Sequence, residues 1–322
     1  RELNQNCYSQ WKNSTVLCTS ETPIETANGT VNFTGRTSTS TVSGVRGLTD
    51  YIAPYKRTVK FDDVLPNLNV NWKVAGPHSL YASYAESLTL PRTDNLYTVY
   101  FDENGDITSP IADPETSKTF DVGYRFQTGA LIASANVWYT KFQNRILSTY
   151  DQETGISADR NVGDVDLYGF DSQLGLAPTE ALSVYLTASY TESEIKSDYV
   201  TGTTTIAVGG KSLVEVPDWT LGARVSYQKG PLSFGAQAKY VGSRWLTDLN
   251  DVAVPSYTVV NADARFDLGY FGMEGTELAL NVINLLDEEY FGSLGTGTDY
   301  TSSLYASQGA PRTIQASVRY AF

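Results

Sequence analysis

Hydrophobic and polar residues alternate one by one along most of the chain after residue 65. Between Trp219 and Tyr227 every second residue is apolar, and the residues between them, such as Arg224, are polar or glycine. Successive side chains of a β-strand point to opposite faces, so a period of two predicts strands with one apolar and one polar face. Eleven such strands are predicted, at residues 66–75, 78–89, 117–127, 131–146, 161–176, 181–194, 216–228, 231–246, 256–268, 276–290 and 311–322.

The joins between these strands alternate strictly between short and long. The short joins are residues 76–77, 128–130, 177–180, 229–230 and 269–275, and the long, polar joins are residues 91–116, 147–160, 195–215, 247–255 and 291–310. Glycine and proline at Gly230-Pro231 are typical of a tight turn. The alternation predicts an all-β, antiparallel up-and-down barrel with tight turns at one rim and long loops at the other.

The length and the charges of these strands separate two kinds of all-β protein. A soluble antiparallel sandwich or propeller also has alternating strands, but they are usually about five or six residues long. The strands predicted here have about 10–16 residues, enough to cross a bilayer at the tilt of a barrel strand. Charged residues also stand in mid-strand, where the lumen of a transmembrane barrel tolerates them and a dry core does not. The residues expected to line that lumen, and to pair with one another or hold a plug, are Asp121, Arg125, Asp171, Arg224, Lys239, Asp263, Arg265, Asp267 and Arg319.

The composition excludes several classes of function. The net charge is −13, from 23 basic and 36 acidic residues, which argues against a nucleic-acid partner because binding phosphates requires a basic face. One histidine, His78, and two cysteines are too few for a typical metal centre, and no metal or other cofactor is expected. The sequence has no serine elbow and no catalytic cysteine or histidine triad, so no catalytic residue is assigned and no enzyme is expected.

The strand count and the amino terminus indicate part of a longer protein. Eleven strands form an open sheet, and an open sheet edge in lipid costs several kcal/mol for each unpaired backbone group. The chain starts at Arg1 without a signal-peptide pattern. Residues 1–65 contain no convincing span and are interpreted as an extracellular loop region, followed by the barrel strands in residues 66–322.

Short motifs near the carboxyl terminus carry a resemblance to a known family. Asn284-Leu285-Leu286-Asp287-Glu288-Glu289-Tyr290, then Gly309-Ala310-Pro311-Arg312-Thr313 and the ending Tyr320-Ala321-Phe322, resemble the closing hairpin of TonB-dependent outer-membrane receptors. Pro114-Glu115-Thr116-Ser117, and Asn161-Val162-Gly163 followed by Tyr168-Gly169-Phe170-Asp171, are similar to recurrent features of the same barrels.

The resemblance covers residues 66–322 and implies the second half of a barrel of about 22 strands in the cell outer membrane. It implies import of a scarce nutrient, most often a ferric siderophore, driven from the inner membrane. The implied partners are the TonB complex, acting through a plug that these residues do not contain, the barrel-assembly machinery, outer-membrane lipid and lipopolysaccharide, and a small nutrient ligand. The family also places the last strand's Ile314, Val318, Tyr320 and Phe322 in the signal for barrel assembly.

Two further sets of residues follow from this interpretation. Cys7 and Cys18 are expected to form a disulfide in an exported loop, with a buried thiol pair or a metal half-site as the alternative. Aromatic residues of the outer loops are candidates for ligand contact, although girdle or loop packing would explain them as well. These candidates are Trp11, Tyr51, Tyr55, Tyr97, Tyr100, Trp245, Tyr300 and Tyr305.

Other functions remain open from the sequence. The same strands would suit a receptor for carbohydrate, cobalamin or haem, because these receptors differ mainly in loops and plug. A passive outer-membrane pore or an adhesin is a second alternative. A third is a soluble secreted β-rich enzyme acting on polysaccharide, with paired carboxylates such as Glu192 with Glu194, or Asp164 with Asp166, as catalysts.

Overall fold

The computed structural model describes residues 56–92, 112–151, 156–201, 204–302 and 304–321, together with short strands within residues 2–6, 17–18, 24–26, 29–31, 51–52, 100–101 and 107–108. Side chains are described for residues 60–92, 112–146, 161–199, 205–302 and 304–321. No helix in this part of the chain is long and apolar enough to cross a membrane.

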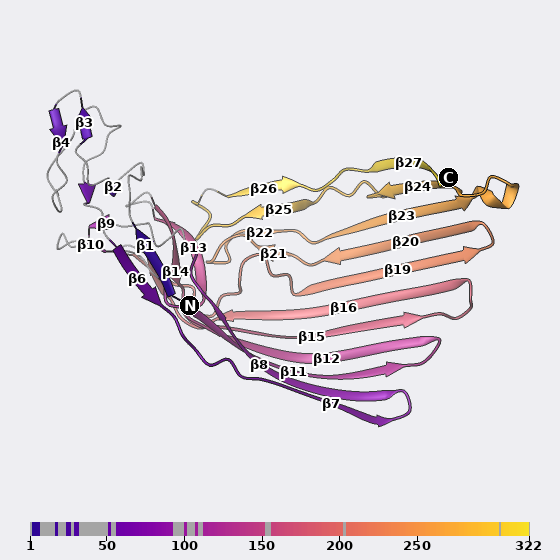
Figure 1. Ribbon diagram of the computed structural model, residues 1–322, viewed down its shortest axis with the longest axis horizontal. Helices are drawn as coiled ribbons and strands as arrows, with labels where there is room; N and C mark the ends of the chain where they lie inside the picture. Colours follow the sequence, from indigo (N-terminus) through magenta and orange to yellow (C-terminus); the bar gives the residue numbers. More distant parts are fainter. Residues whose placement is uncertain are drawn as a thin grey trace.

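One antiparallel sheet of eleven strands dominates the structure (Figure 1). Each strand pairs with the strands before and after it in the sheet's chain order, so the topology is a simple meander. The prediction of eleven antiparallel strands is therefore confirmed. The strands are β7 (Asn67–Ala75), β8 (His78–Thr89), β11 (Glu115–Gln127), β12 (Leu131–Gln143), β15 (Val165–Leu176), β16 (Leu182–Ile195), β19 (Trp219–Lys229), β20 (Leu232–Val241), β23 (Tyr257–Asp267), β24 (Thr276–Ile283) and β27 (Thr313–Tyr320).

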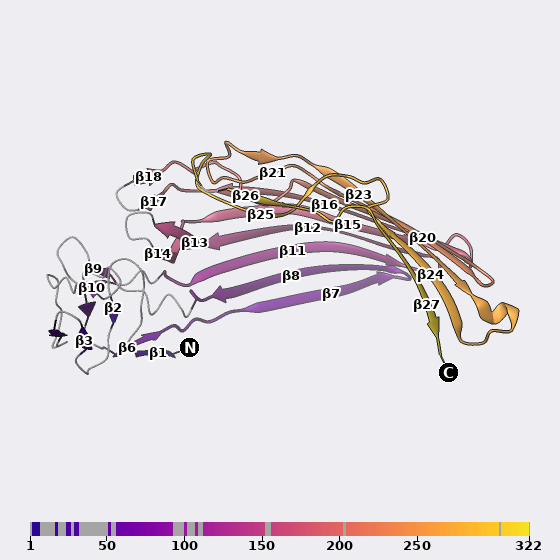
Figure 2. The same ribbon diagram turned by 90° about the horizontal axis from the view of Figure 1, so that it is seen from above.

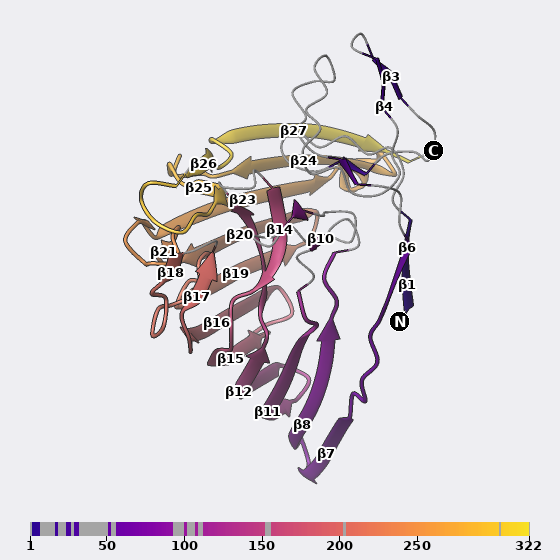
Figure 3. The same cartoon turned by 90° about the vertical axis from the view of Figure 1, so that its left-hand side faces the viewer.

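The sheet is strongly curved and open (Figures 2 and 3). Strands β7 and β27 form its two edges, and among the described residues each pairs with a single strand of the sheet. The successive right-handed twist of long antiparallel strands produces such curvature, which is the shape of a barrel wall.

All short turns lie at one end of the sheet, and all long links lie at the other (Figure 1). Two of the short turns contain Gly76 and Gly230, whose φ angles of 54° and 59° are accessible to glycine at little cost. The last short turn is longer and contains a 3₁₀-helix, η2 (Leu268–Phe271).

The long links contain small two-stranded sheets that are separate from the large one. Residues 1–65 likewise contribute no strand to the large sheet among the described residues. These pairs are β1 (Glu2–Asn6) with β6 (Lys56–Lys60), β2 (Leu17–Cys18) with β5 (Tyr51–Ile52), β3 (Ile24–Thr26) with β4 (Gly29–Val31), β9 (Tyr100–Phe101) with β10 (Ile107–Thr108), β13 (Ile146–Asp151) with β14 (Ile156–Asn161), β17 (Tyr199–Thr201) with β18 (Thr204–Ile206), β21 (Arg244–Trp245) with β22 (Ala253–Val254), and β25 (Phe291–Gly295) with β26 (Tyr305–Gln308).

Several predicted strands extend too far into the long links. The strand predicted at residues 131–146 ends at Gln143, and that predicted at 276–290 ends at Ile283. In both cases the next residue, Asn144 or Asn284, has a φ angle above 50°, which breaks the extended backbone. The predicted strands 161–176 and 231–246 likewise shrink to 165–176 and 232–241. The alternation is already lost at these breaks, in the polar run Gln143-Asn144-Arg145 and in Asn284-Leu285-Leu286-Asp287-Glu288-Glu289-Tyr290, so the predicted strands are too long.

Candidate functional site: the polar face and the long-link end

The eleven-stranded sheet has two chemically different faces, fixed by the register of its strands. The face with Val122, Val225 and Val318 is called the apolar face, and these three side chains are 54%, 44% and 70% exposed. Residues directly opposite one another in neighbouring strands share a face, so the pairing of Val122 with Val137 and of Val225 with Ala236 keeps this face apolar across strands. The opposite face, which carries Asp121, Arg125, Asn136, Asp171, Arg224 and Asp263, is called the polar face.

A continuous polar row crosses the polar face near mid-strand. The register joins Tyr81 to Gly123, Gly123 to Asn136, Asn136 to Asp171, and Asp171 to Ser189. A Cβ atom on Gly123 would lie 2.3 Å from the Tyr81 ring, so only glycine leaves room for the ring at this position. A groove of about 300 Å³ runs along this row and is lined by Tyr81, Arg125, Ser134, Asn136, Asp171, Ser172, Gln173, Thr187 and Ser189.

The predicted lumen charges all lie on this face, and only some of them have partners on it. Arg224 forms an ion pair with Asp263, with Nη2 and Oδ1 3.0 Å apart. The Arg125 guanidinium lies 4.2 Å from the centre of the Tyr81 ring, and Asp121 accepts a hydrogen bond from Asn136 (2.8 Å). The remaining predicted charges form no ion pair within the described residues; these are Asp171, Lys239, Arg265, Asp267 and Arg319.

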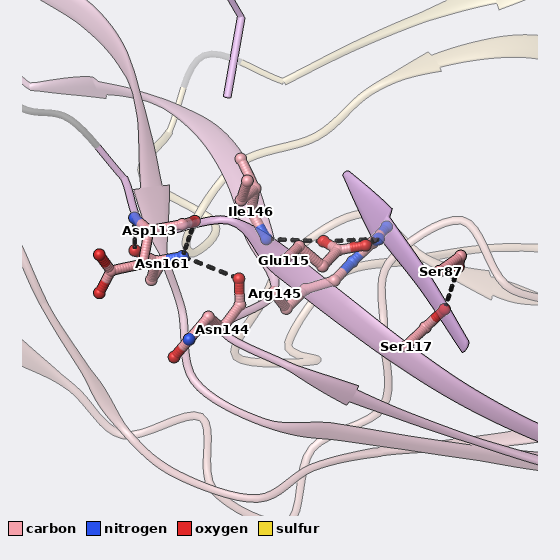
Figure 4. Close-up of polar contacts among 8 residues, drawn as sticks. All are labelled: Ser87, Asp113, Glu115, Ser117, Asn144, Arg145, Ile146 and Asn161. Atoms are coloured by element: carbon pink, nitrogen blue, oxygen red, sulfur yellow. Dashed lines mark hydrogen bonds and ion pairs between the residues drawn. The ribbon is translucent and has the colours of Figure 1, made fainter. Parts of the chain in front are cut away.

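At the long-link end, a polar clamp holds three chain segments together (Figure 4). The Glu115 carboxylate, only 4% exposed, accepts hydrogen bonds from Arg145 Nη1 (2.8 and 3.0 Å) and from the Ile146 amide (2.8 Å). The Asn161 side chain accepts from the Asp113 amide (2.7 Å) and donates to the carbonyls of Asp113 and Asn144 (3.0 and 2.8 Å). Glu115 and Asn161 therefore fix the start of β11 to both ends of the link between β12 and β15.

The long-link end also has a hydrophobic core, formed by the links and the adjoining ends of β15 and β16. The buried residues Val162, Val165, Ile195, Tyr199, Val208 and Leu213 pack together there. Tyr199 donates to the buried carboxylate of Asp248 (2.8 Å), and burial raises the pKa of Asp248 above its usual value.

Backbone contacts extend this packing to the last long link. The amides of Asp248 and Leu249 donate to the carbonyls of Gly297 and Thr298 (3.0 Å each). Asn250 accepts from the Ser212 amide (2.8 Å) and donates back to the Ser212 carbonyl (3.0 Å). Four successive links, between β12 and β15, β16 and β19, β20 and β23, and β24 and β27, are thereby joined into one structure.

The aromatic ligand candidates fall into two groups. Trp11, Tyr55 and Tyr97 lie outside the described residues, and Tyr51 and Tyr100 lie in β5 and β9, where only the strand is described. The three described candidates are all at the long-link end. Trp245 in β21 is half-buried, whereas Tyr300 and Tyr305 are 72% and 66% exposed. The Tyr300 amide donates to Asp251 (3.3 Å), which brings its link against the one that carries Trp245. Beside Tyr300, hydrogen bonds from the Thr301 hydroxyl and amide lower the pKa of Asp299.

The remaining predicted residues are only partly described. Cys7 and Phe322 lie outside the described residues, as does the side chain of Cys18. Ile314, Val318 and Tyr320 are exposed on the apolar face of β27, 67%, 70% and 64% respectively.

Three of the four carboxylates considered for an enzyme are engaged in ion pairs. Lys196 lies between Asp166 (3.1 Å) and Glu194 (2.7 Å), and Lys141 lies 3.4 Å from Asp164. Glu192 accepts a hydrogen bond from Tyr190. Opposite charges on neighbouring segments, such as Asp166 in β15 and Lys196 directly after β16, stabilise strand pairing.

The structural roles of Glu115, Asn161, Asp248 and Asn250 were not predicted from the sequence, although Glu115 and Asn161 lie in the quoted motifs.

The structural role of the carboxyl-terminal motifs was not predicted either. Asn284 is fully buried, donates to the carbonyls of Glu288 and Ala310 (2.9 and 3.0 Å) and accepts from the Glu288 amide. Asp287 accepts from the Arg312 amide (2.9 Å). These bonds join the two ends of the last long link and give the two motifs a shared structural role.

Comparison with known proteins places these features in a family. The family described as "TonB dependent receptor-like, beta-barrel" matches residues 23–285. The ferrioxamine receptor of Yersinia enterocolitica is 28% identical over 249 residues, which are 76% of this chain and 31% of the receptor. The ferrichrome outer membrane transporter/phage receptor of Escherichia coli K12 is 29% identical over 187 residues, covering 56% of this chain and 24% of that protein. The chain thus spans at most about a third of the length of these relatives.

Solved structures share the fold. The siderophore receptor PiuA from Acinetobacter baumannii superposes with a TM-score of 0.65 at 24% identity, covering 83% of this chain and 37% of that one. The ferric yersiniabactin uptake receptor FyuA from Yersinia pestis has a TM-score of 0.66 at 17% identity, with 85% and 39% covered. The copper transporter OprC also matches, with a TM-score of 0.63 at 19% identity over 83% of this chain and 41% of that one.

Proposed function

Since the chain belongs to the TonB-dependent receptor-like β-barrel family, we propose that it forms half of the wall and part of the outer mouth of an outer-membrane siderophore importer. The apolar face contacts lipid and the polar face lines the lumen. The long links face the outside of the cell, and the short turns face the periplasm. Family membership also supports the prediction that the chain is a receptor rather than an enzyme.

The observation that carries this proposal is the separation of the two faces across all eleven strands. An exposed apolar face of this size would cause a soluble protein to aggregate, whereas in a membrane the acyl chains of lipid cover such a face. Aromatic rings gather on this face near the long-link end, where Tyr190 and Trp219 lie 5.1 Å apart and Phe170 and Trp219 lie 5.6 Å apart. From Trp219 to Tyr227 the tilted strand spans roughly 20 Å, close to the height of the apolar band of such barrels.

The remaining strands of the barrel and the plug are proposed to come from residues beyond this chain. The uncovered edges of β7 and β27 would pair with those strands, because lipid offers backbone groups no hydrogen bonds. The polar-face charges without an ion pair, Asp171 and Arg265 among them, would contact the plug. Through that plug the TonB complex would drive transport.

The ligand is proposed from the relatives and from the aromatic residues of the mouth. Matched relatives are named as receptors for ferrioxamine, ferrichrome, ferric pyoverdine and catecholate siderophores. Trp245, Tyr300 and Tyr305 would offer ring faces to such a ligand, together with the predicted aromatics outside the described residues. Cys7 and Cys18 would join as a disulfide in residues 1–65, and the last strand would be recognised by the barrel-assembly machinery.

Uptake of radioactive iron tests the function directly. Cells that express the complete receptor, and a strain that lacks it, are supplied with ⁵⁵Fe bound to a hydroxamate, a catecholate or citrate. We expect receptor-dependent uptake of at least one chelate, abolished by collapse of the proton gradient. Uptake that survives the collapse would instead indicate a passive pore. Receptor-dependent uptake of a carbohydrate, cobalamin or haem, with none of any ferric chelate, would assign a different ligand.

A further inference from the structure

Arg244 in β21 differs from two other arginines at the long-link end. Arg145 and Arg312 each form an ion pair with a carboxylate. Arg244 is half-buried, and it forms no ion pair within the part of the chain that the structure describes. Its buried Nε has no hydrogen-bond acceptor there, and its Nη2 donates to the Phe291 carbonyl (3.2 Å). A half-buried cation with only a neutral carbonyl as acceptor is well placed to bind an anion from outside the chain.

Two tyrosine rings lie beside this guanidinium. Its carbon atom is 5.8 Å from the centre of the Tyr257 ring, within the range of a cation–π contact. The Tyr257 and Tyr290 rings stack on each other at 4.6 Å, with 28° between the planes. A Cβ atom on Gly309 would lie 2.0 Å from the Tyr290 ring, so the lack of a side chain at Gly309 makes room for this ring. The stacked rings therefore give Arg244 a defined position without using its N–H donors.

The group lies where the polar face of the sheet meets the mouth. Tyr257 begins β23 and pairs with Val241 at the end of β20. Successive strand residues point to opposite faces, so Tyr257 shares the polar face with Asp263. The bond from Arg244 to the Phe291 carbonyl joins β21 to the start of β25, and both lie at the long-link end (Figures 1 and 3). A ligand that enters the lumen from outside would pass this position.

We propose that Arg244 binds the negative charge of an anionic ferric chelate, so that the receptor prefers anionic chelates to cationic ones. The inference rests on the proposed function, because it requires the ligand to enter through this mouth. A guanidinium presents a planar set of N–H donors that suits paired anionic oxygens such as those of a carboxylate. One donor is used by the Phe291 carbonyl, and the others remain for the ligand. Because Tyr257 and Tyr290 already hold the guanidinium, binding loses less side-chain entropy.

Binding of ⁵⁵Fe chelates to cells on ice, where transport stops, tests this preference on the complete receptor. The probes are ferric citrate and a ferric tris-catecholate, which are anionic, ferrichrome, which is uncharged, and ferrioxamine B, which is cationic. Arg244→Gln removes the charge and keeps polar donors, whereas Arg244→Lys keeps the charge. Arg312→Gln is the matched control, because that arginine already has a carboxylate partner.

We expect the parent receptor to bind an anionic chelate most tightly. Arg244→Gln should weaken this binding by about tenfold, which corresponds to the loss of one charge-assisted hydrogen bond. Binding of the uncharged and cationic chelates should not weaken. Arg244→Lys should recover most of the lost affinity, and Arg312→Gln should bind as the parent does.

The other outcomes distinguish this inference from the function on which it rests. Equal weakening of every chelate by Arg244→Gln would show that Arg244 only holds β21 to β25, and it would overturn the proposal. Unchanged binding of the anionic chelates would overturn it as well. A parent receptor that binds only ferrichrome or ferrioxamine B would overturn the anionic preference and leave the importer intact. Binding of none of the probes would contradict the proposed function itself.

Discussion

At the long-link end Val162 and Val165 are 1% and 0% exposed, whereas on the apolar face of the sheet Val70 and Val137 are 54% and 62% exposed. The same residue type is thus packed into a protein core in one region and left for the surroundings to cover in the other. The links fold as an ordinary small protein does, by burying apolar side chains together. The wall buries little by itself, and its apolar face is suited to lipid rather than to water.

The same contrast applies to buried and exposed charges. Glu115 is almost fully buried and is bonded by Arg145 and the Ile146 amide, whereas Arg224 and Asp263 on the polar face are 40% and 22% exposed. A charge buried among protein atoms must be fully paired. A charge in a wet or plug-filled lumen has less need of a partner within the wall. Substitutions in the two regions should therefore have different costs and different causes.

The largest effect is expected for a charge placed on the apolar face. Val225→Arg should reduce the unfolding free energy of the receptor in phospholipid vesicles by about 2–4 kcal/mol, because an arginine at mid-membrane must leave water. The adjacent Ser226→Arg, on the polar face, is the matched control and should cost far less. Chemical denaturation in vesicles measures both. Equal losses for the two variants would contradict the assignment of the faces.

The next effect is expected at the polar clamp. Glu115→Ala should lower the free energy of local opening of the β13–β14 hairpin by about 2–3 kcal/mol, because it leaves Arg145 and the Ile146 amide without their acceptor. This figure is at the low end for a buried pair since the Arg145 side chain is 31% exposed. Hydrogen exchange of residues 146–151 and 156–161 reports the opening. Glu115→Gln keeps an acceptor for the Ile146 amide and should lower the opening free energy by less. If Glu115→Gln costs as much as Glu115→Ala, the charge of Glu115 alone is what holds the clamp.

A smaller, pH-dependent effect is expected at Asp248. Its pKa is raised in the folded state, so the folded chain holds this proton to higher pH than the unfolded chain does. The stability that this group contributes is fully present below the usual aspartate pKa and is lost as the pH rises from there through the raised value. At pH 7, Asp248→Asn should therefore stabilise the packed links by about 1 kcal/mol. Hydrogen-exchange protection of residues 205–213 should then vary less with pH in the variant than in the parent. An unchanged pH dependence would contradict the role of Asp248.

The smallest effect is expected for the exposed pair of Arg312 and Asp287, whose side chains are 48% and 49% exposed. Arg312→Ala should lower the unfolding free energy by less than about 1 kcal/mol, because water screens such pairs. The Asp287 bond to the backbone amide of residue 312 survives this substitution. A loss as large as that from Glu115→Ala would mean that the closing link depends on the ion pair itself.

The sequence predicts the wall much better than it predicts the mouth, for a physical reason. A strand with one face in lipid and one in a lumen must alternate along its whole length, so local periodicity reveals all eleven strands. At Asn144 and Asn284 a change of backbone angle ends the strand, and the alternation is lost there as well. The core around Val208 and the burial of Asp248 depend on links that are distant in sequence, and no local pattern signals them. The roles of Trp245, Tyr300 and Tyr305 in ligand binding remain predictions.

The lipid contact of one face is tested most directly by a spin-label scan along β19. Each residue from 219 to 228 is replaced in turn by a labelled cysteine in the receptor reconstituted into phospholipid vesicles. Accessibility is then measured to oxygen, which dissolves in lipid, and to a water-soluble nickel chelate. The account predicts high oxygen accessibility at the odd-numbered positions and low oxygen accessibility at the even-numbered ones. Loss of this period of two, with both faces equally accessible to the nickel chelate or equally shielded, would contradict it.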